Sequence, residues 1–173
     1  MNTKEQRPKG RLKRGLMKAL AIVTAPAVGV VLMAGPASAA PLCNYTADYN
    51  ACITISKTSS GKYLLHLGID MRKLSKQEAQ TIINASRYVF QAELWGSDGG
   101  GVLDDFQAYM PVQTRMWAPA EGGLSAEFDS YPSASALNED PGGGDELYAK
   151  IIFTDPRTGA KRTFKTPEFF GFF

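Results

Sequence analysis

Hydrophobic and polar residues alternate along several short stretches of this 173-residue chain. Ile53 and Ile55 fall on one face of residues 52–57, and the alternation returns over residues 63–69, after the turn residues 59–61. A period of two is typical of a β-strand with one buried face. Because only a short Ser-Ser-Gly turn separates the two stretches, they predict a β-hairpin.

The same pattern recurs along the rest of the chain. It predicts strands over residues 88–95, 106–116 (bent near Pro111), 124–128, 147–154, 161–165 and 169–173. A single helix is expected to begin at Ser75, since Glu78 three residues later completes a capping box. Seven or eight short strands with one short helix predict a mainly β protein, a single-domain antiparallel β-sandwich.

The first 39 residues have the pattern of a bacterial secretory signal peptide rather than of a folded segment. A basic stretch is followed by residues 19–34 without charge and by Ala37-Ser38-Ala39, a small-residue cleavage site. Pro26 and Gly29 interrupt the apolar run, which argues against a transmembrane helix. Without an adjacent pair of arginines, the general secretory pathway is expected. Cleavage would leave residues 40–173 as a secreted domain with no transmembrane segment.

The basic charge of the chain belongs to this leader. Seven of the 19 Lys/Arg and one of the 17 Asp/Glu lie in residues 1–39, which leaves 12 basic and 16 acidic residues and a net charge of −4. Such a balance gives no indication of nucleic-acid binding. Both cysteines, Cys43 and Cys52, lie beyond the leader, and in an exported chain they predict one disulfide.

Two acidic, glycine-rich loops carry the sharpest functional hypothesis. Residues 96–105 contain Asp98, Asp104 and Asp105, and residues 138–146 contain Asp140 and Asp145. Calcium takes six to eight oxygen ligands from carboxylates and flexible backbone. These five aspartates therefore predict a calcium site if the two loops lie at the same end of the sandwich. Alternatively, they are ordinary turn residues that keep the surface polar.

These segments resemble the C2 domain family. Glu93-Leu94-Trp95-Gly96-Ser97-Asp98 followed by Asp104-Asp105-Phe106 is similar to one calcium loop of C2 domains, and residues 145–150 running to 161–166 are similar to their other signature. The two signatures occur here in reversed order, with Gly96 in place of an aspartate and Glu146 in place of a proline. The resemblance implies an antiparallel sandwich that binds calcium.

No pattern of catalytic residues stands out, and we expect no enzyme. The single histidine, His66, shares a face with Leu64 and Gly68 and has no second metal-ligating residue type nearby. No Gly-x-Ser-x-Gly nucleophile motif occurs. Acids on predicted strands, such as Glu127 and Asp129, are common in any acidic sandwich.

The sequence thus predicts a secreted, non-enzymatic binding or interaction module, with calcium as its possible cofactor. The alternatives are a carbohydrate-binding or protease-inhibitor-like module that uses exposed aromatics or a loop, and a structural secreted protein without metal. Its partner would be an extracellular ligand, protein or carbohydrate.

Four aromatic residues can either line a carbohydrate-binding face or, as the favoured interpretation, pack in the core: Trp95, Trp117, Tyr109 and Tyr131.

Overall fold

The computed structural model describes residues 40–97, 105–109, 113–138 and 143–173. The predicted signal peptide, residues 1–39, lies outside the described residues. Within them, the strands are β1 (Leu42–Tyr45), β2 (Tyr49–Lys57), β3 (Tyr63–Met71), β4 (Phe90–Gly96), β5 (Phe106–Tyr109), β6 (Arg115–Trp117), β7 (Leu124–Ser130), β8 (Asp145–Thr154), β9 (Lys161–Lys165) and β10 (Phe169–Gly171). The helix α1 spans Lys76–Ala85, and a 3-10 turn, η1, spans Ala134–Ala136.

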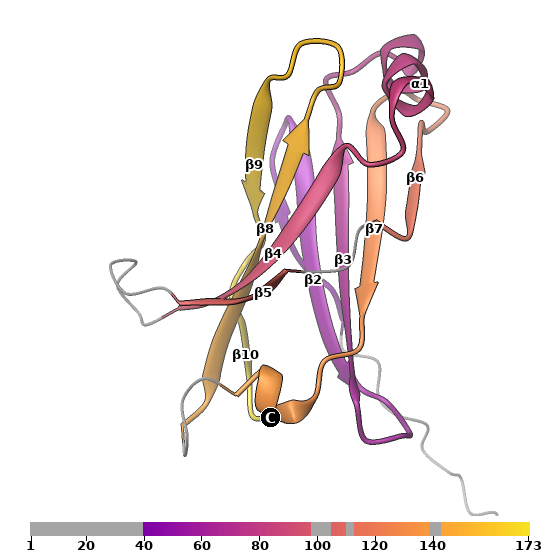
Figure 1. Cartoon of the computed structure of the whole chain (residues 1–173). Helices are drawn as coiled ribbons and strands as arrows, with labels where there is room; N and C mark the ends of the chain where they lie inside the picture. The colour runs from indigo at the N-terminus through magenta and orange to yellow at the C-terminus, as the bar shows by residue number, and fades with distance from the viewer. Residues whose placement is uncertain (1–39, 98–104, 110–112, 139–142) are drawn as a thin grey trace, which may run out of the picture. The chain divides into compact units, whose positions relative to one another are not determined.

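The described strands form two antiparallel sheets of five strands each (Figure 1). Sheet A has the order β1-β2-β3-β7-β6. Sheet B has the order β10-β8-β4-β5, and β9 pairs with β8 on the edge that β10 also uses. The mainly β class, the antiparallel pairing and the single α-helix are therefore as predicted, and so is the β2–β3 hairpin.

The predicted strand count of seven or eight is wrong, because the described residues contain ten strands. The stretch 106–116, predicted as one bent strand, is two strands in different sheets: β5 pairs with β4, and β6 pairs with β7. The chain thus changes sheets between Tyr109 and Arg115. The other additional strand, β1, is four residues long and has no apolar alternation to reveal it.

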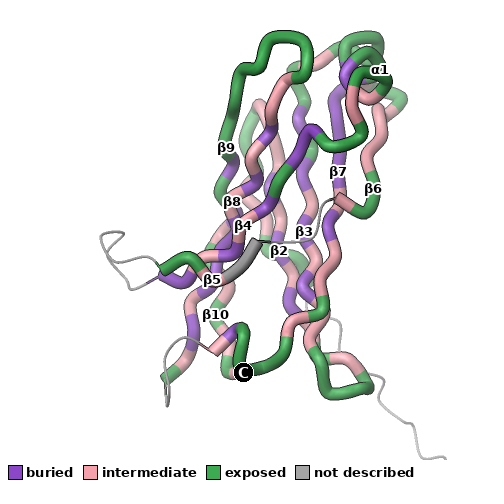
Figure 2. Tube along the Cα trace, viewed as in Figure 1, coloured by how far each residue is buried: buried purple, intermediate pink, exposed green. Residues whose placement is uncertain are grey.

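The inner faces of both sheets contribute to one buried core. Figure 2 shows buried residues alternating with partly exposed ones along the central strands. Ile53 of β2, Leu67 of β3 and Phe128 of β7 are fully buried in sheet A, as are Leu147 and Ile151 of β8 in sheet B. Fully burying such a side chain contributes about 1.5–3 kcal/mol. Core formation thus leaves the alternate residues of each strand on the outer faces.

The helix begins as the sequence predicts. The Glu78 backbone N–H donates to Ser75 Oγ at 3.2 Å, and the Ser75 backbone N–H donates to Glu78 Oε2 at 2.8 Å. The Ser75 hydroxyl also donates to Glu78 Oε2, at 2.7 Å, and the hydrogen bonds from the Ser75 backbone and hydroxyl to this carboxylate hold the pKa of Glu78 below its ordinary value. Ala79 and Ile82 place their side chains in the core, and α1 lies at the end of sheet A near β6 (Figure 1). In the described part of the chain, no helix has the length and apolar character needed to span a membrane.

Candidate functional site

The outer face of sheet A carries rows of polar residues, because strand pairing aligns the alternate positions of β2, β3, β7 and β6. One row runs Asn50, Asp70, Ser125 and Trp117 across the four strands. The next row, two residues along, runs Cys52, Gly68, Glu127 and Arg115, and a third runs Thr54, His66 and Asp129. The inner-face residues between these rows belong to the core.

Two adjoining hollows lie over these rows, and we refer to them together as the sheet-A groove. The first has a volume of about 480 Å³ and the second of about 500 Å³. Asp70 and Trp117 line both hollows, so the two meet at these side chains. The first is lined in addition by Pro41, Cys52, Thr54, Ser56, Leu64, His66, Gly68, Ile69, Ala126 and Glu127, and the second by Asn50, Met71, Arg72, Pro119, Glu121, Gly122, Gly123 and Ser125.

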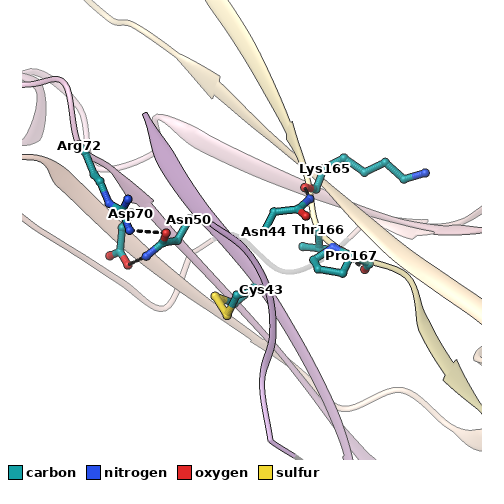
Figure 3. Close-up of a disulfide and its surroundings, with 9 residues drawn as sticks. Cys43, Asn44, Asn50, Asp70, Arg72, Lys165, Thr166 and Pro167 are labelled. Atoms are coloured by element: carbon teal, nitrogen blue, oxygen red, sulfur yellow. Dashed lines mark hydrogen bonds between the residues drawn. A yellow bond between two sulfur atoms is a disulfide. The ribbon is translucent and has the colours of Figure 1, made fainter. Parts of the chain in front are cut away.

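A hydrogen-bond network fixes one part of this groove. Asp70 accepts from Ser125 Oγ at 2.6 Å and from Asn50 Nδ2 at 3.5 Å. Arg72 donates to Asn50 Oδ1 and, at 2.6 Å, to the carbonyl oxygen of Thr46. Figure 3 shows the Arg72–Asn50–Asp70 chain beside the disulfide. These hydrogen bonds hold the side chains in place within the groove.

The histidine is fixed in the same way. His66 Nδ1 lies 2.7 Å from Asp129 Oδ1, and both side chains are more than a third exposed. As predicted, His66 shares the outer face with Leu64 and Gly68. Asp129, on β7, could not be identified as its partner from the sequence, because nothing local indicates that β3 pairs with β7.

Both tryptophans lie on outer faces and not in the core, contrary to the favoured interpretation. Trp117 is half-buried at the junction of the two hollows, with the Arg115 guanidinium 4.6 Å from its ring centroid. Trp95, on sheet B, is covered by Lys150 Nζ at 3.3 Å from its ring centroid and donates to Glu93 Oε2. Tyr131 is 62% exposed, and the side chain of Tyr109 lies outside the description. Trp117 lines both hollows of the sheet-A groove, and Trp95 lines neither of these two.

The predicted disulfide is confirmed: Cys43 of β1 is bonded to Cys52 of β2, directly across the β1–β2 ladder. Cys52 borders the groove. The bond therefore holds the edge strand β1 beside the candidate site.

The predicted calcium ligands are described only in part. Asp98, Asp104 and Asp140 lie outside the described residues; Asp105 is exposed and Asp145 is fully buried. The described residues that flank the two loops are adjacent, since the Gly96 N–H donates to the Asp105 carbonyl and the Ser97 N–H donates to the Glu146 carbonyl, both at 2.8 Å. Among the described side chains alone, no cluster of three or more His, Cys, Asp or Glu is arranged to hold a metal ion.

Comparison with protein-family models, with curated proteins and with solved structures found no match to this chain. The similarity to C2 domains therefore stays a prediction from short sequence segments.

Proposed function

We propose that this protein is a secreted, non-enzymatic binding module, built as a β-sandwich, whose ligand lies in the sheet-A groove. The observation that carries this proposal is Gly68. It occupies the middle of β3, a central strand of sheet A, where glycine weakens a strand and marks a bulge, a bend or the close approach of a ligand or another backbone. The pairing of β3 with β2 and with β7 is regular through Gly68, so no bulge accounts for it.

The fold itself gives no reason for glycine at this position. Gly68 has no positive φ, and a Cβ built there would meet only the Cβ of Cys52, at 4.0 Å. That is an ordinary van der Waals contact. The fold would therefore tolerate a side chain at residue 68. What glycine provides there is open space, because a side chain at this position would fill part of the first hollow.

Preorganisation of the groove supports the same function. Trp117 is held against Arg115, Asp70 is held by Ser125 and Asn50, and His66 is paired with Asp129. Rigid polar and aromatic groups around a hollow reduce the entropy lost when a ligand binds.

The test is binding of the purified protein to arrays of glycans and peptides, followed by two groove variants. Gly68→Val fills the hollow with a residue that favours strands, and Trp117→Ala removes the ring at its centre. Both should weaken the binding of any ligand found by at least tenfold. Thr163→Val, which places the same side chain on the exposed β9 of sheet B, is the matched control and should leave binding unchanged. Equal affinity in Gly68→Val and the unaltered protein would exclude the groove.

Calcium binding at the end of β4 is a second candidate function. Two backbone hydrogen bonds favour it, one from Gly96 to Asp105 and one from Ser97 to Glu146. They bring residues that flank the two acidic loops to the two sides of β4. The resemblance to C2 domains implies the same ligand.

Calcium binding is tested by thermal melting with and without the metal. A ligand bound only by the folded state stabilises it by about 2.7 kcal/mol at a concentration 100-fold above its Kd. The melting temperature should therefore rise with added calcium but not in the double variant Asp98→Asn/Asp104→Asn. No rise at millimolar calcium would rule out this candidate and leave the groove proposal intact.

A further inference from the structure

The chemistry of the sheet-A groove narrows the class of ligand that it can hold. The first element is the orientation of His66. Its Nδ1 lies 2.7 Å from Asp129 Oδ1, and an ionised carboxylate only accepts hydrogen bonds, so Nδ1 carries the proton. In the neutral imidazole, Nε2 is then a bare acceptor. His66 lines the first hollow, and within the described residues its Nε2 makes no hydrogen bond, so the ring can offer this nitrogen to a ligand in the groove.

The second element is the carboxylate of Glu127, which also lines the first hollow. Arg115 lies directly across the strand pair from Glu127, yet its guanidinium packs on the Trp117 ring. Within the part of the chain that the structure describes, the Glu127 carboxylate makes neither a hydrogen bond nor an ion pair. It is a second acceptor for a ligand.

The third element is the charge balance of the groove. Arg72 lines the second hollow and Arg115 lies over the Trp117 ring, whereas no lysine lines either hollow in the described residues. The carboxylates of Asp70, Glu121 and Glu127 outnumber these two guanidinium groups and give the groove a net acidic character. Like charges at close range repel, so a phosphate, sulfate or carboxylate ligand is disfavoured.

The fourth element separates neutral ligands from cationic ones. The Arg115 guanidinium already occupies a cation position over the Trp117 ring, 4.6 Å from its centroid. A second cation at this ring would meet the charge of Arg115. What remains favourable at Trp117 is packing of an uncharged, partly apolar surface such as the C–H face of a sugar ring.

We propose that the sheet-A groove binds a neutral saccharide. Its hydroxyl groups donate to the Glu127 carboxylate and to His66 Nε2, and its C–H face packs on Trp117. This inference rests on the proposed function and specifies its ligand. It also distinguishes the groove from an acidic-lipid site, which would need basic side chains.

The experiment is calorimetric titration of the purified protein with four probes: neutral hexose oligosaccharides, N-acetylated amino-sugar oligosaccharides, heparin and oligolysine. A neutral oligosaccharide should bind, and heparin and oligolysine should not bind in the groove.

Glu127→Gln replaces a charge-assisted hydrogen bond by a neutral one and should weaken binding about tenfold. His66→Phe keeps a ring but removes the acceptor and should also weaken binding. Glu146→Gln, which removes one negative charge from β8 of sheet B, should have no effect.

The outcomes separate the two proposals. Heparin or oligolysine binding that Gly68→Val abolishes would keep the groove as the binding site and overturn the saccharide inference. Oligosaccharide binding that is insensitive to Glu127→Gln, His66→Phe and Gly68→Val alike would place the ligand elsewhere and overturn both. If none of the oligosaccharides binds, the saccharide inference is also wrong.

Discussion

Gly68, within β3, and Gly123, directly before β7, illustrate opposite reasons for a glycine. At Gly68 a Cβ meets only the Cys52 Cβ, at 4.0 Å, whereas at Gly123 it would lie 2.6 Å from the Met71 carbonyl oxygen and φ is +94°. The backbone requires glycine at residue 123, because a left-handed conformation and a close contact both exclude a side chain. At residue 68 neither condition holds.

We therefore predict changes of opposite sign for the two alanine substitutions. Gly68→Ala should stabilise the fold by about 0.5–1 kcal/mol, because alanine loses less conformational entropy than glycine in a strand. The melting temperature should rise by roughly 2–4 °C. Gly123→Ala should lower it. Calorimetry of both variants checks this, and a lower melting temperature for Gly68→Ala would show that the fold, rather than a ligand, requires this glycine.

Residue-level patterns predicted part of the groove. Alternation placed Leu64, His66 and Gly68 on one face, because the side-chain period of a strand is a local property. It could not place Asp129 beside His66, or Trp117 over the same hollow. Those positions depend on β3 pairing with β7 and β7 with β6, which are contacts between segments far apart in the sequence.

At the scale of single elements, the turn between β8 and β9 is held by one ion pair. Arg157 donates from Nε to Asp155 Oδ1 at 2.9 Å and from Nη2 to Oδ2 at 2.7 Å, and its backbone N–H donates to Oδ1. The hydrogen bonds from the Arg157 side chain hold the pKa of the Asp155 carboxyl below its ordinary value. The same interactions raise the pKa of Arg157.

This geometry predicts an acid-dependent loss of stability in the turn. Because the folded-state pKa of Asp155 is lowered, its contribution is complete above the unfolded-state value of about 3.9 and is lost as the pH falls through the folded-state pKa. Asp155→Asn should thus destabilise the protein near neutral pH, and the difference from the unaltered protein should shrink below about pH 4. Urea unfolding midpoints at several pH values measure this difference. A difference that stays constant with pH would contradict the role of the charge.

At the same scale, the elements predicted best are those with complete local signals. The α1 capping box is local, and the sequence identified Ser75 and Glu78 correctly. The division of residues 106–116 into β5 and β6 was missed, because a change of sheet is not visible in a continuous alternating pattern.

At the scale of the described domain, β1 connects the two sheets. Its Cys43 is bonded to Cys52 of sheet A, and its Asn44 Nδ2 donates to the Lys165 carbonyl oxygen of β9, in sheet B, at 2.7 Å (Figure 3). Only four residues pair β1 with β2, and the disulfide adds a covalent constraint that holds this edge strand, and its link to β9, in place.

Removing the disulfide should consequently destabilise the domain without destroying the groove. A cross-link that closes a loop of this length contributes about 2–3 kcal/mol by restricting the unfolded chain, and β2, β3, β7 and β6 pair without it. Cys43→Ser/Cys52→Ser should unfold at lower urea concentration than the unaltered protein. Reductant should lower the urea midpoint of the unaltered protein and leave that of the double variant unchanged. Ligand binding below the unfolding transition should survive in the double variant.

If reductant leaves the urea midpoint of the unaltered protein unchanged, the disulfide does not stabilise the fold. Loss of binding by the folded double variant would instead show that the groove depends on β1.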